Sequence, residues 1–107
     1  MTPLLVITNC PNATCAETIA MAVVEERLAA CVNIMPPCRS IYLWLGAIEA
    51  AEEIPLLIKT TSNRYTELEA VIKTHHPYTV PEIIAIPISQ GLPAYLEWLV
   101  AETNTLD

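Results

Sequence analysis

The sequence predicts an α+β sandwich whose elements follow the order β-α-β-β-α-β, with a closing helix. Short apolar runs alternate with segments in which apolar residues recur at helical spacing. A long apolar stretch in the middle reverses at Gly46, one of only two glycines. Prolines interrupt the stretches at 31–45 and 83–88. Because proline cannot donate a ladder hydrogen bond, these two stretches are expected at the edges of the sheet.

The first strand is predicted at Leu4–Thr8. This run is apolar without polar alternation, which is typical of a strand covered on both faces. Thr14 and Glu17 then fit a capping box, in which the threonine oxygen accepts a helix N–H and the glutamate reaches back. Good helix formers continue to Ala30, and the expected apolar face consists of Ile19, Val23, Val24 and Leu28.

Residues 31–60 predict a hairpin that is long for so small a domain. The first arm covers 31–45 and is interrupted by Pro36-Pro37, and the second arm returns through 48–60. Pro55 falls within the second arm, so we expect it in the projecting part of the hairpin or at a bulge. A hairpin that projects beyond its own sheet has unpaired apolar flanks, and another subunit is the simplest cover.

The remaining chain predicts a second helix, an edge strand at 83–88 and a third amphipathic helix. Ser62 is expected to cap the second helix, and Pro77 stops it. One face of that helix carries Tyr65, Leu68, Val71, Ile72 and His75. The third helix has apolar positions at Leu92, Tyr95, Leu96 and Leu99, and the tail 103–107 is polar and expected to fray. If the crossovers between parallel strands are right-handed, this order of elements predicts the ferredoxin-like split βαβ arrangement. The four predicted strands then lie in the sheet in the order 4-1-3-2.

Composition narrows the class of protein. A chain of 107 residues is expected to form one domain over 1–107. Hydrophobic residues make up 53% and charged residues 16%, which favours a homo-oligomer that buries the apolar excess. The net charge of −7 argues against nucleic acid. The N-terminus has no signal-peptide pattern and no stretch is long enough to span a membrane, so we expect a cytoplasmic protein with no membrane partner.

The run from Lys73 to Tyr78 holds both histidines, His75 and His76, and Glu82 follows closely. Two imidazoles and a carboxylate in so short a stretch are the best candidate for ligand chemistry. Adjacent helical residues point about 100° apart, so both rings can hold one ion only if Pro77 unwinds the helix end. The alternative is that they satisfy the last helix carbonyls and complement the dipole.

Other chemistry-bearing patterns are sparse. The four cysteines, at 10, 15, 31 and 38, lack the paired CxxC spacing of a structural zinc site and are expected to be buried or half-buried thiols. Two glycines leave no room for a phosphate-binding loop, and no GxSxG or HExxH motif is present. The sequence therefore predicts no enzyme.

Several blocks in order along nearly the whole chain resemble the CutA family of divalent-cation tolerance proteins. They are Glu26-Arg27-Leu28-Ala29-Ala30-Cys31-Val32-Asn33, Tyr42-x-Trp44-x-Gly46-x-Ile48-Glu49, Ile58-Lys59-Thr60-Thr61, His76-Pro77-Tyr78-x-x-Pro81-Glu82-Ile83-Ile84 and Tyr95-Leu96-x-Trp98-Leu99. The resemblance implies a ferredoxin-like homotrimer in which long hairpins wrap adjacent subunits. It also implies binding of copper or another divalent cation in connection with metal tolerance.

The metal site implied by the resemblance uses a cysteine at the end of the first strand and two consecutive histidines. His75 and His76 match the histidines, whereas Thr8 stands at the cysteine position. A hydroxyl is a poor ligand for copper(I), which prefers thiolate. Cys10 has the same strand parity as Thr8 and is the possible substitute.

Two further interpretations remain open. Lys59 lies in an apolar strand and needs a partner or an exit to water. It could form a structural ion pair with Glu49, Glu53 or Glu82, or it could bind a ligand in an intersubunit cleft near Tyr78 and Glu82. In the latter case the protein is a trimeric small-molecule sensor or signalling protein. The last alternative is an interaction scaffold without a ligand.

Overall fold

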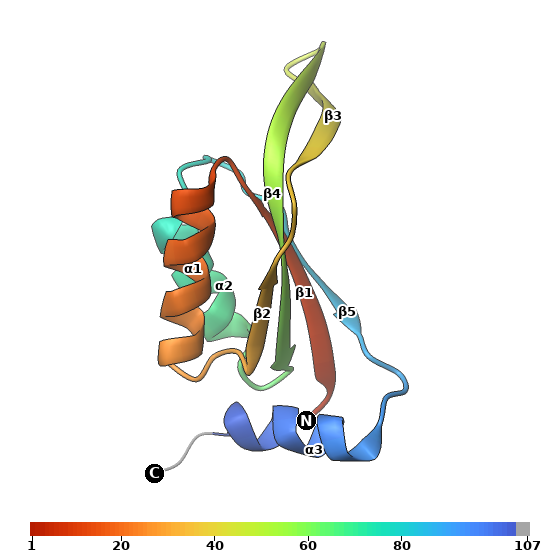
Figure 1. The fold of residues 1–107 in the computed structure, drawn as a ribbon. Coiled ribbons are helices and arrows are strands. Elements are labelled where there is room, and N and C mark those ends of the chain that lie inside the picture. The colour runs from red at the N-terminus through yellow and green to blue at the C-terminus, as the bar shows by residue number, and fades with distance from the viewer. Residues whose placement is uncertain (105–107) are drawn as a thin grey trace.

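The computed structural model describes residues 1–104 and contains an antiparallel sheet with two helices packed on one face (Figure 1). The strands are β1 (Pro3–Cys10), β2 (Cys31–Ile34), β3 (Cys38–Trp44), β4 (Ala47–Thr61) and β5 (Ile83–Pro87). The helices are α1 (Ala13–Glu25), α2 (Tyr65–His75) and α3 (Pro93–Glu102). α1 and α2 cover the sheet, whereas α3 crosses its lower end and the β3–β4 hairpin projects from the upper end.

The sheet has the order β2-β4-β1-β5, with β3 pairing to the outer part of β4. This is the ferredoxin-like order predicted from the sequence, in which the split second strand and the last strand form the edges. Pro87 pairs with Leu4 on the edge strand β5, where its missing N–H removes no central hydrogen bond. The predicted fold class is therefore confirmed.

A bulge divides the first arm of the hairpin into β2 and β3. Ile34 pairs with Leu56, but Cys38 pairs with Glu53, so three residues of the first arm oppose two of β4. The Met35 N–H donates to the Pro55 carbonyl at 2.9 Å. In an antiparallel strand the N and O of one residue point to the same side, so the ring nitrogen of Pro55 also faces this interruption. The expected position of Pro55 at a bulge is confirmed.

The hairpin reverses in a two-residue turn at Leu45 and Gly46. Both residues have positive φ angles, 50° and 83°. That combination is typical of a type I′ turn, which matches the right-handed twist of the flanking strands. The reversal predicted at Gly46 is therefore confirmed.

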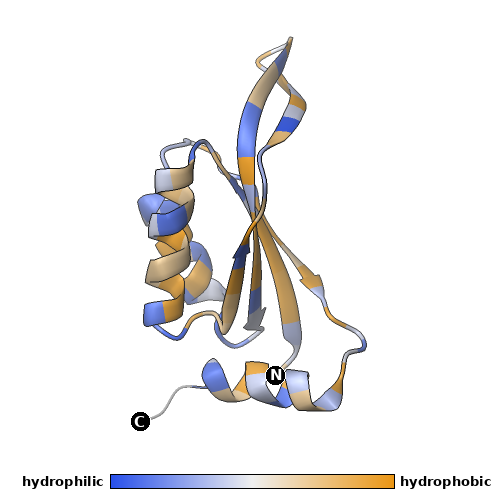
Figure 2. Cartoon of the chain, viewed as in Figure 1, coloured by the Kyte–Doolittle hydropathy of each residue, from blue (hydrophilic) through white to orange (hydrophobic). Residues whose placement is uncertain are grey.

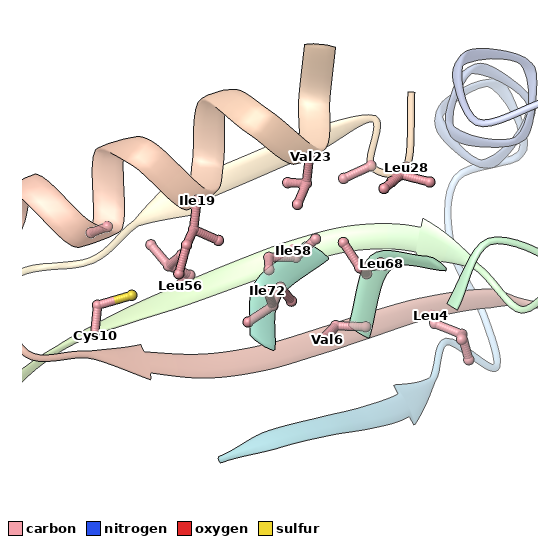
Figure 3. Packing of buried hydrophobic residues seen from close by; sticks show 12 residues of the cluster. Leu4, Val6, Cys10, Ile19, Val23, Leu28, Leu56, Ile58, Leu68 and Ile72 are labelled. Atoms are coloured by element: carbon pink, nitrogen blue, oxygen red, sulfur yellow. The ribbon is translucent and has the colours of Figure 1, made fainter. Parts of the chain in front are cut away.

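The core lies between the sheet and the two covering helices (Figure 3). Val6, Ile19, Ile58 and Ile72 are fully buried and come from four different elements. Within the chain, β1 alternates between buried and half-buried residues, with Leu5 and Ile7 on the side that the helices leave open. The expectation that both faces of the first strand are covered is wrong for the single chain, because α1 and α2 pack on one side only.

Both ends of α1 differ from the prediction. The helix cap is Asn12, whose Oδ1 accepts from the Cys15 N–H at 2.8 Å, rather than Thr14. The helix stops at Glu25 instead of Ala30 because Arg27 adopts a left-handed conformation with φ 58°. The Leu28 N–H then returns to the Val23 carbonyl at 2.9 Å, which completes a Schellman motif.

The other two helices also correct details of the prediction. Ser62 does not cap α2, because its hydroxyl accepts from the Thr2 N–H and the helix begins after Arg64. His75 is exposed rather than on the buried face. At the end of α3, Thr103 is buried and its hydroxyl donates to the Leu99 carbonyl at 2.8 Å, so the tail is ordered there. Residues 105–107 of the predicted frayed tail lie outside the described residues.

Apolar side chains remain exposed on the projecting hairpin and on β5. Both segments contain hydrophobic residues, coloured orange in Figure 2. In the hairpin Ile41, Leu43 and Ile48 are about two-thirds exposed or more, and Leu43 pairs with Ile48 across the two strands. On β5, Ile84 and Ile86 are nearly half exposed. Among residues 1–104, no helix has both the length and the apolar character needed to cross a bilayer.

Candidate functional site

His76 is buried and uses both of its ring nitrogens. The Tyr78 N–H donates to Nδ1 at 3.2 Å, so Nδ1 is the acceptor and Nε2 carries the proton. Nε2 then donates to the Asn9 carbonyl at 2.7 Å. The ring also packs against Tyr78, with 4.7 Å between the ring centroids. His76 therefore fastens the segment after α2 to the end of β1.

His75 lies at the end of α2, and its ring is exposed. Its backbone carbonyl accepts from the Cys15 thiol at 3.9 Å, which ties the end of α2 to the first turn of α1. His76 has already left helical geometry, with ψ at 132°, because Pro77 follows it. The unwinding expected here does occur, but it leaves one ring buried and the other exposed.

The end of β1 places Thr8 and Cys10 on the helix-covered side, as their shared strand parity predicts. Thr8 is fully buried and its hydroxyl has no hydrogen-bond partner. Cys10 is also fully buried and lies beside the thiol of Cys15. Burial, and then the neighbouring Cys15 thiol, raise the pKa of Cys10 from 9.0 to about 12.

These side chains do not assemble a ready metal centre within one chain. Across residues 1–104, no group of three or more His, Cys, Asp and Glu side chains is arranged to hold a metal ion. His76 offers no free nitrogen, and Cys10 would first have to lose a proton that burial retains. Of the predicted metal ligands, only the exposed ring of His75 is accessible without rearrangement.

A cleft of about 650 Å³ opens between the base of the hairpin and the segment after α2. It contains Tyr78 and Glu82, two of the three residues predicted to line a ligand-binding cleft. The full lining is Asn9, Ser40, Ile41, Tyr42, Trp44, Glu49, Glu53, Pro77, Tyr78, Thr79, Val80 and Glu82. Three stretches that are distant in the sequence thus meet at one site.

Glu53 is the residue of this cleft whose role sequence reasoning missed. It is only 8% exposed, and its carboxylate lies close enough to the Tyr78 hydroxyl to affect the pKa of that group. Burial raises the pKa of Tyr78 above its ordinary value, and the Glu53 carboxylate raises that pKa further. At the opposite wall, Glu82 Oε1 accepts from Asn9 Nδ2 at 3.3 Å. The alternation of β4 could have placed Glu53 on the same face as Glu49, but not opposite Tyr78.

Lys59, the third residue predicted for a cleft between subunits, does not line this cleft within one chain. It pairs with Cys31 and Leu5 in the middle of the sheet, and its amine donates to Asn33 Oδ1. It lies six positions after Glu53 along β4, which corresponds to about 20 Å along the strand. Its partner is therefore an amide on the neighbouring strand, rather than one of the three glutamates proposed for an ion pair.

The fold and the site define a ferredoxin-like α+β domain with a projecting hairpin and a cleft at its base. Residues 4–102 match the family described as "CutA1 divalent ion tolerance protein". The chain therefore belongs to the CutA1 family.

Similar proteins agree with this assignment. A divalent-cation tolerance protein CutA from Thermus thermophilus is 50% identical over 100 residues, which cover 94% of this chain and 97% of that protein. Protein CutA from mouse is 47% identical over 98 residues, covering 92% of this chain, but this chain spans only 55% of the mouse protein.

Solved structures have the same fold. The Thermus thermophilus divalent cation tolerance protein superimposes with a TM-score of 0.94 at 48% identity, covering 95% of this chain and 99% of that one. The periplasmic divalent cation tolerance protein CutA from Archaeoglobus fulgidus superimposes with a TM-score of 0.92 at 39% identity, covering 95% of this chain and 99% of that one.

Proposed function

We propose that this protein binds copper or another divalent cation and acts in the tolerance of, or response to, metal ions. Its membership of the CutA1 family supports the connection with divalent cations. The observation that carries the site is the exposed His75 ring, since the other histidine is fully engaged. The proposed role is binding rather than catalysis.

The chemistry of His75 and its surroundings fits a cation. Imidazole suits copper and zinc, and a net charge of −7 raises the local concentration of cations. The thiols of Cys15 and Cys10 lie nearby, and thiolates are the ligands that copper(I) prefers. Binding to Cys10 would release a proton, so the contribution of that thiol is expected to grow as the pH rises.

Titrating copper(II) and zinc into wild type, His75→Ala and His76→Ala tests the site. His75→Ala is expected to weaken binding at least about tenfold, since even the loss of a residue that only orients a ligand costs this much. His76→Ala is expected to act mainly by lowering the melting temperature, because two partly buried hydrogen bonds are lost. Thr66→Ala, at an exposed position of α2, is the control. Unchanged affinity and stoichiometry in His75→Ala would contradict the assignment.

We further propose that the protein works as a cytoplasmic homotrimer. The exposed apolar residues of the hairpin and of β5 support the assembly, since they give neighbouring subunits two surfaces to cover. The four free cysteines are consistent with a reducing compartment. Native mass spectrometry should give three times the chain mass, and fractionation of the source cells should recover the protein with soluble cytoplasmic markers.

A second candidate function is a small-molecule sensor, which the cleft at Tyr78 and Glu82 favours. Its volume lies within the range of ligand-binding pockets, and it combines rings with a few polar groups. A thermal-shift screen with nucleotides and metabolites tests this function. No shift with any compound at millimolar concentration would leave cation binding, or a scaffold role without ligand.

A further inference from the structure

The cleft at the base of the hairpin is both acidic and aromatic. Its lining includes three carboxylates, from Glu49, Glu53 and Glu82. It also includes three aromatic rings, from Tyr42, Trp44 and Tyr78. None of the twelve lining residues is basic. A cleft of this composition has no internal countercharge, so its own electrostatics favour a positively charged occupant.

Within the cleft, Glu53 is the carboxylate that we expect to attract a cation most strongly. Glu53 is only 8% exposed. Neither of the ion pairs found in residues 1–104 includes Glu53. The Tyr78 hydroxyl is a neutral partner and does not cancel the charge. A cationic ligand would therefore meet a carboxylate that no cationic side chain of the described residues pairs with.

The aromatic rings are available for contact with a ligand. Tyr42, Trp44 and Tyr78 are each between 38% and 45% exposed, although all three line the cleft. Tyr42 pairs directly with Glu49 across the hairpin, so a ring and a carboxylate stand side by side. Ring faces next to carboxylates attract ammonium and guanidinium groups by cation–π and ionic interactions.

A bare metal ion fits this cleft poorly. No metal-binding group of three or more acidic, histidine or cysteine side chains exists in the described part of the chain, so the three glutamates do not converge. One oxygen of Glu82 is already held by Asn9. A cavity of about 650 Å³ has room for an extended organic molecule that reaches carboxylate and ring together.

We propose that this cleft binds a small organic cation, an alkylammonium or alkylguanidinium, whose charged head lies on Glu53 and whose stem lies against Tyr42 and Tyr78. This inference rests on the second candidate function, the cleft as a ligand site, and names the class of its ligand. It is independent of cation binding at His75.

Calorimetric titration of the intact protein, in its native oligomeric state and at low salt, tests the proposal. The probes are n-butylguanidinium and its uncharged counterpart n-butylurea, which have nearly the same shape. The guanidinium is expected to bind at least about tenfold more tightly, because only it can form a charge-assisted pair with Glu53. Equal binding of the two probes would overturn the assignment of a cation.

Matched variants locate the binding. Glu53→Gln keeps the shape and the Tyr78 contact and is expected to weaken binding of n-butylguanidinium about tenfold or more. Glu52→Gln removes the charge of a neighbouring β4 residue, which lies opposite Arg39 in the strand register and does not line the cleft, so it should leave binding unchanged. Tyr42→Leu should weaken it several-fold through loss of the ring. Equal losses in Glu52→Gln and Glu53→Gln would mean non-specific attraction and would overturn the proposal.

The remaining outcomes separate this inference from the function on which it rests. Neutral compounds that bind at the cleft while n-butylguanidinium does not would refute the ligand class but retain the sensor function. Failure of every compound, charged or neutral, would remove both. A change of oligomeric mass in Glu53→Gln without any change in probe binding would identify the cleft as a subunit contact and overturn the proposal.

Discussion

At the level of single residues, two side chains that are adjacent in the sequence differ in their hydrogen bonding and therefore in their roles. His75 and His76 are adjacent, yet one ring is exposed and the other has both nitrogens occupied. A histidine that donates from one nitrogen and accepts at the other is held in one ring orientation. The conspicuous pair is therefore one structural residue and one accessible imidazole. The sequence suggested both roles but could not assign them, since the partner of His76 is 67 residues away at Asn9.

Cys10 gives a prediction for the pH dependence of stability. Its pKa is about 12 in the folded chain, against 9.0 for an ordinary thiol. Above pH 9 the unfolded chain therefore loses a proton that the folded chain keeps. The contribution of Cys10 to stability is complete below pH 9 and decreases as the pH rises, with a limiting slope of about 1.4 kcal/mol per pH unit.

Urea unfolding of wild type and Cys10→Ala between pH 8 and 11 measures this contribution. The free energy of unfolding should fall less steeply with pH in Cys10→Ala, whatever its absolute stability. Cys38→Ala, at a half-buried position in β3, should keep the wild-type slope. Identical slopes in wild type and Cys10→Ala would show that the Cys10 thiol does not retain its proton in the folded protein.

Among the helices and strands, the ends of a helix are difficult to predict from the sequence. The free backbone N–H and C=O groups at a helix end can be capped by more than one nearby residue. The pattern Thr14–Glu17 looked like the start of α1, but Asn12 takes the cap. Two polar residues two positions apart can each cap a helix, and the choice follows from how the preceding turn leaves β1. At the other end, Arg27 adopts the left-handed conformation that ends the helix. Glycine is the usual residue at this position, and its absence left no signal in the sequence for the helix end.

Two matched substitutions test this assignment of the cap. Asn12→Ala is expected to lower the free energy of unfolding by about 1 kcal/mol, because the Cys15 N–H loses its acceptor. Thr14→Ala, at an exposed position inside the helix, should change it by no more than about 0.5 kcal/mol. Denaturant titration of the two variants measures both values. A larger loss in Thr14→Ala than in Asn12→Ala would restore the cap predicted from the sequence.

At the scale of the whole molecule, the projecting hairpin is the feature that one chain does not explain. Its two faces differ, since Tyr42 and Glu49 face the cleft whereas Leu43 and Ile48 lie on the other side and are exposed. A hairpin this long has little support from its own sheet beyond the bulge. Association with other copies would cover the apolar face and hold the cleft wall in place.

Charge on the apolar face should therefore weaken the proposed trimer. Leu43→Glu and Ile48→Glu, alone or combined, are expected to shift the protein towards smaller species, because a carboxylate would be buried at the interface. Light scattering coupled to size exclusion over a dilution series measures the shift. Met21→Glu, at an exposed apolar position of α1, is the control and should leave the assembly unchanged. An unaltered mass in the double variant would place the interface elsewhere.

The order of the elements, the sheet order, the edge positions and the hairpin turn could all be predicted from the sequence. These features follow from local rules: apolar periodicity, the missing N–H of Pro87, and the backbone freedom of Gly46. Family resemblance added the motif around His76-Pro77-Tyr78 and the connection with metal ions. The bulge at Pro55 was also foreseeable, because proline restricts where a strand can pair.

Which of the candidate residues share a site became clear from the three-dimensional structure. Glu53 lies beside Tyr78, and Lys59 lies in the middle of the sheet. Both ring nitrogens of His76 are hydrogen-bonded. Burial and hydrogen-bond partners depend on contacts between segments far apart in the chain, and no local pattern encodes them. For that reason the fold could be derived from the sequence, whereas the cleft and its uncompensated carboxylate could not.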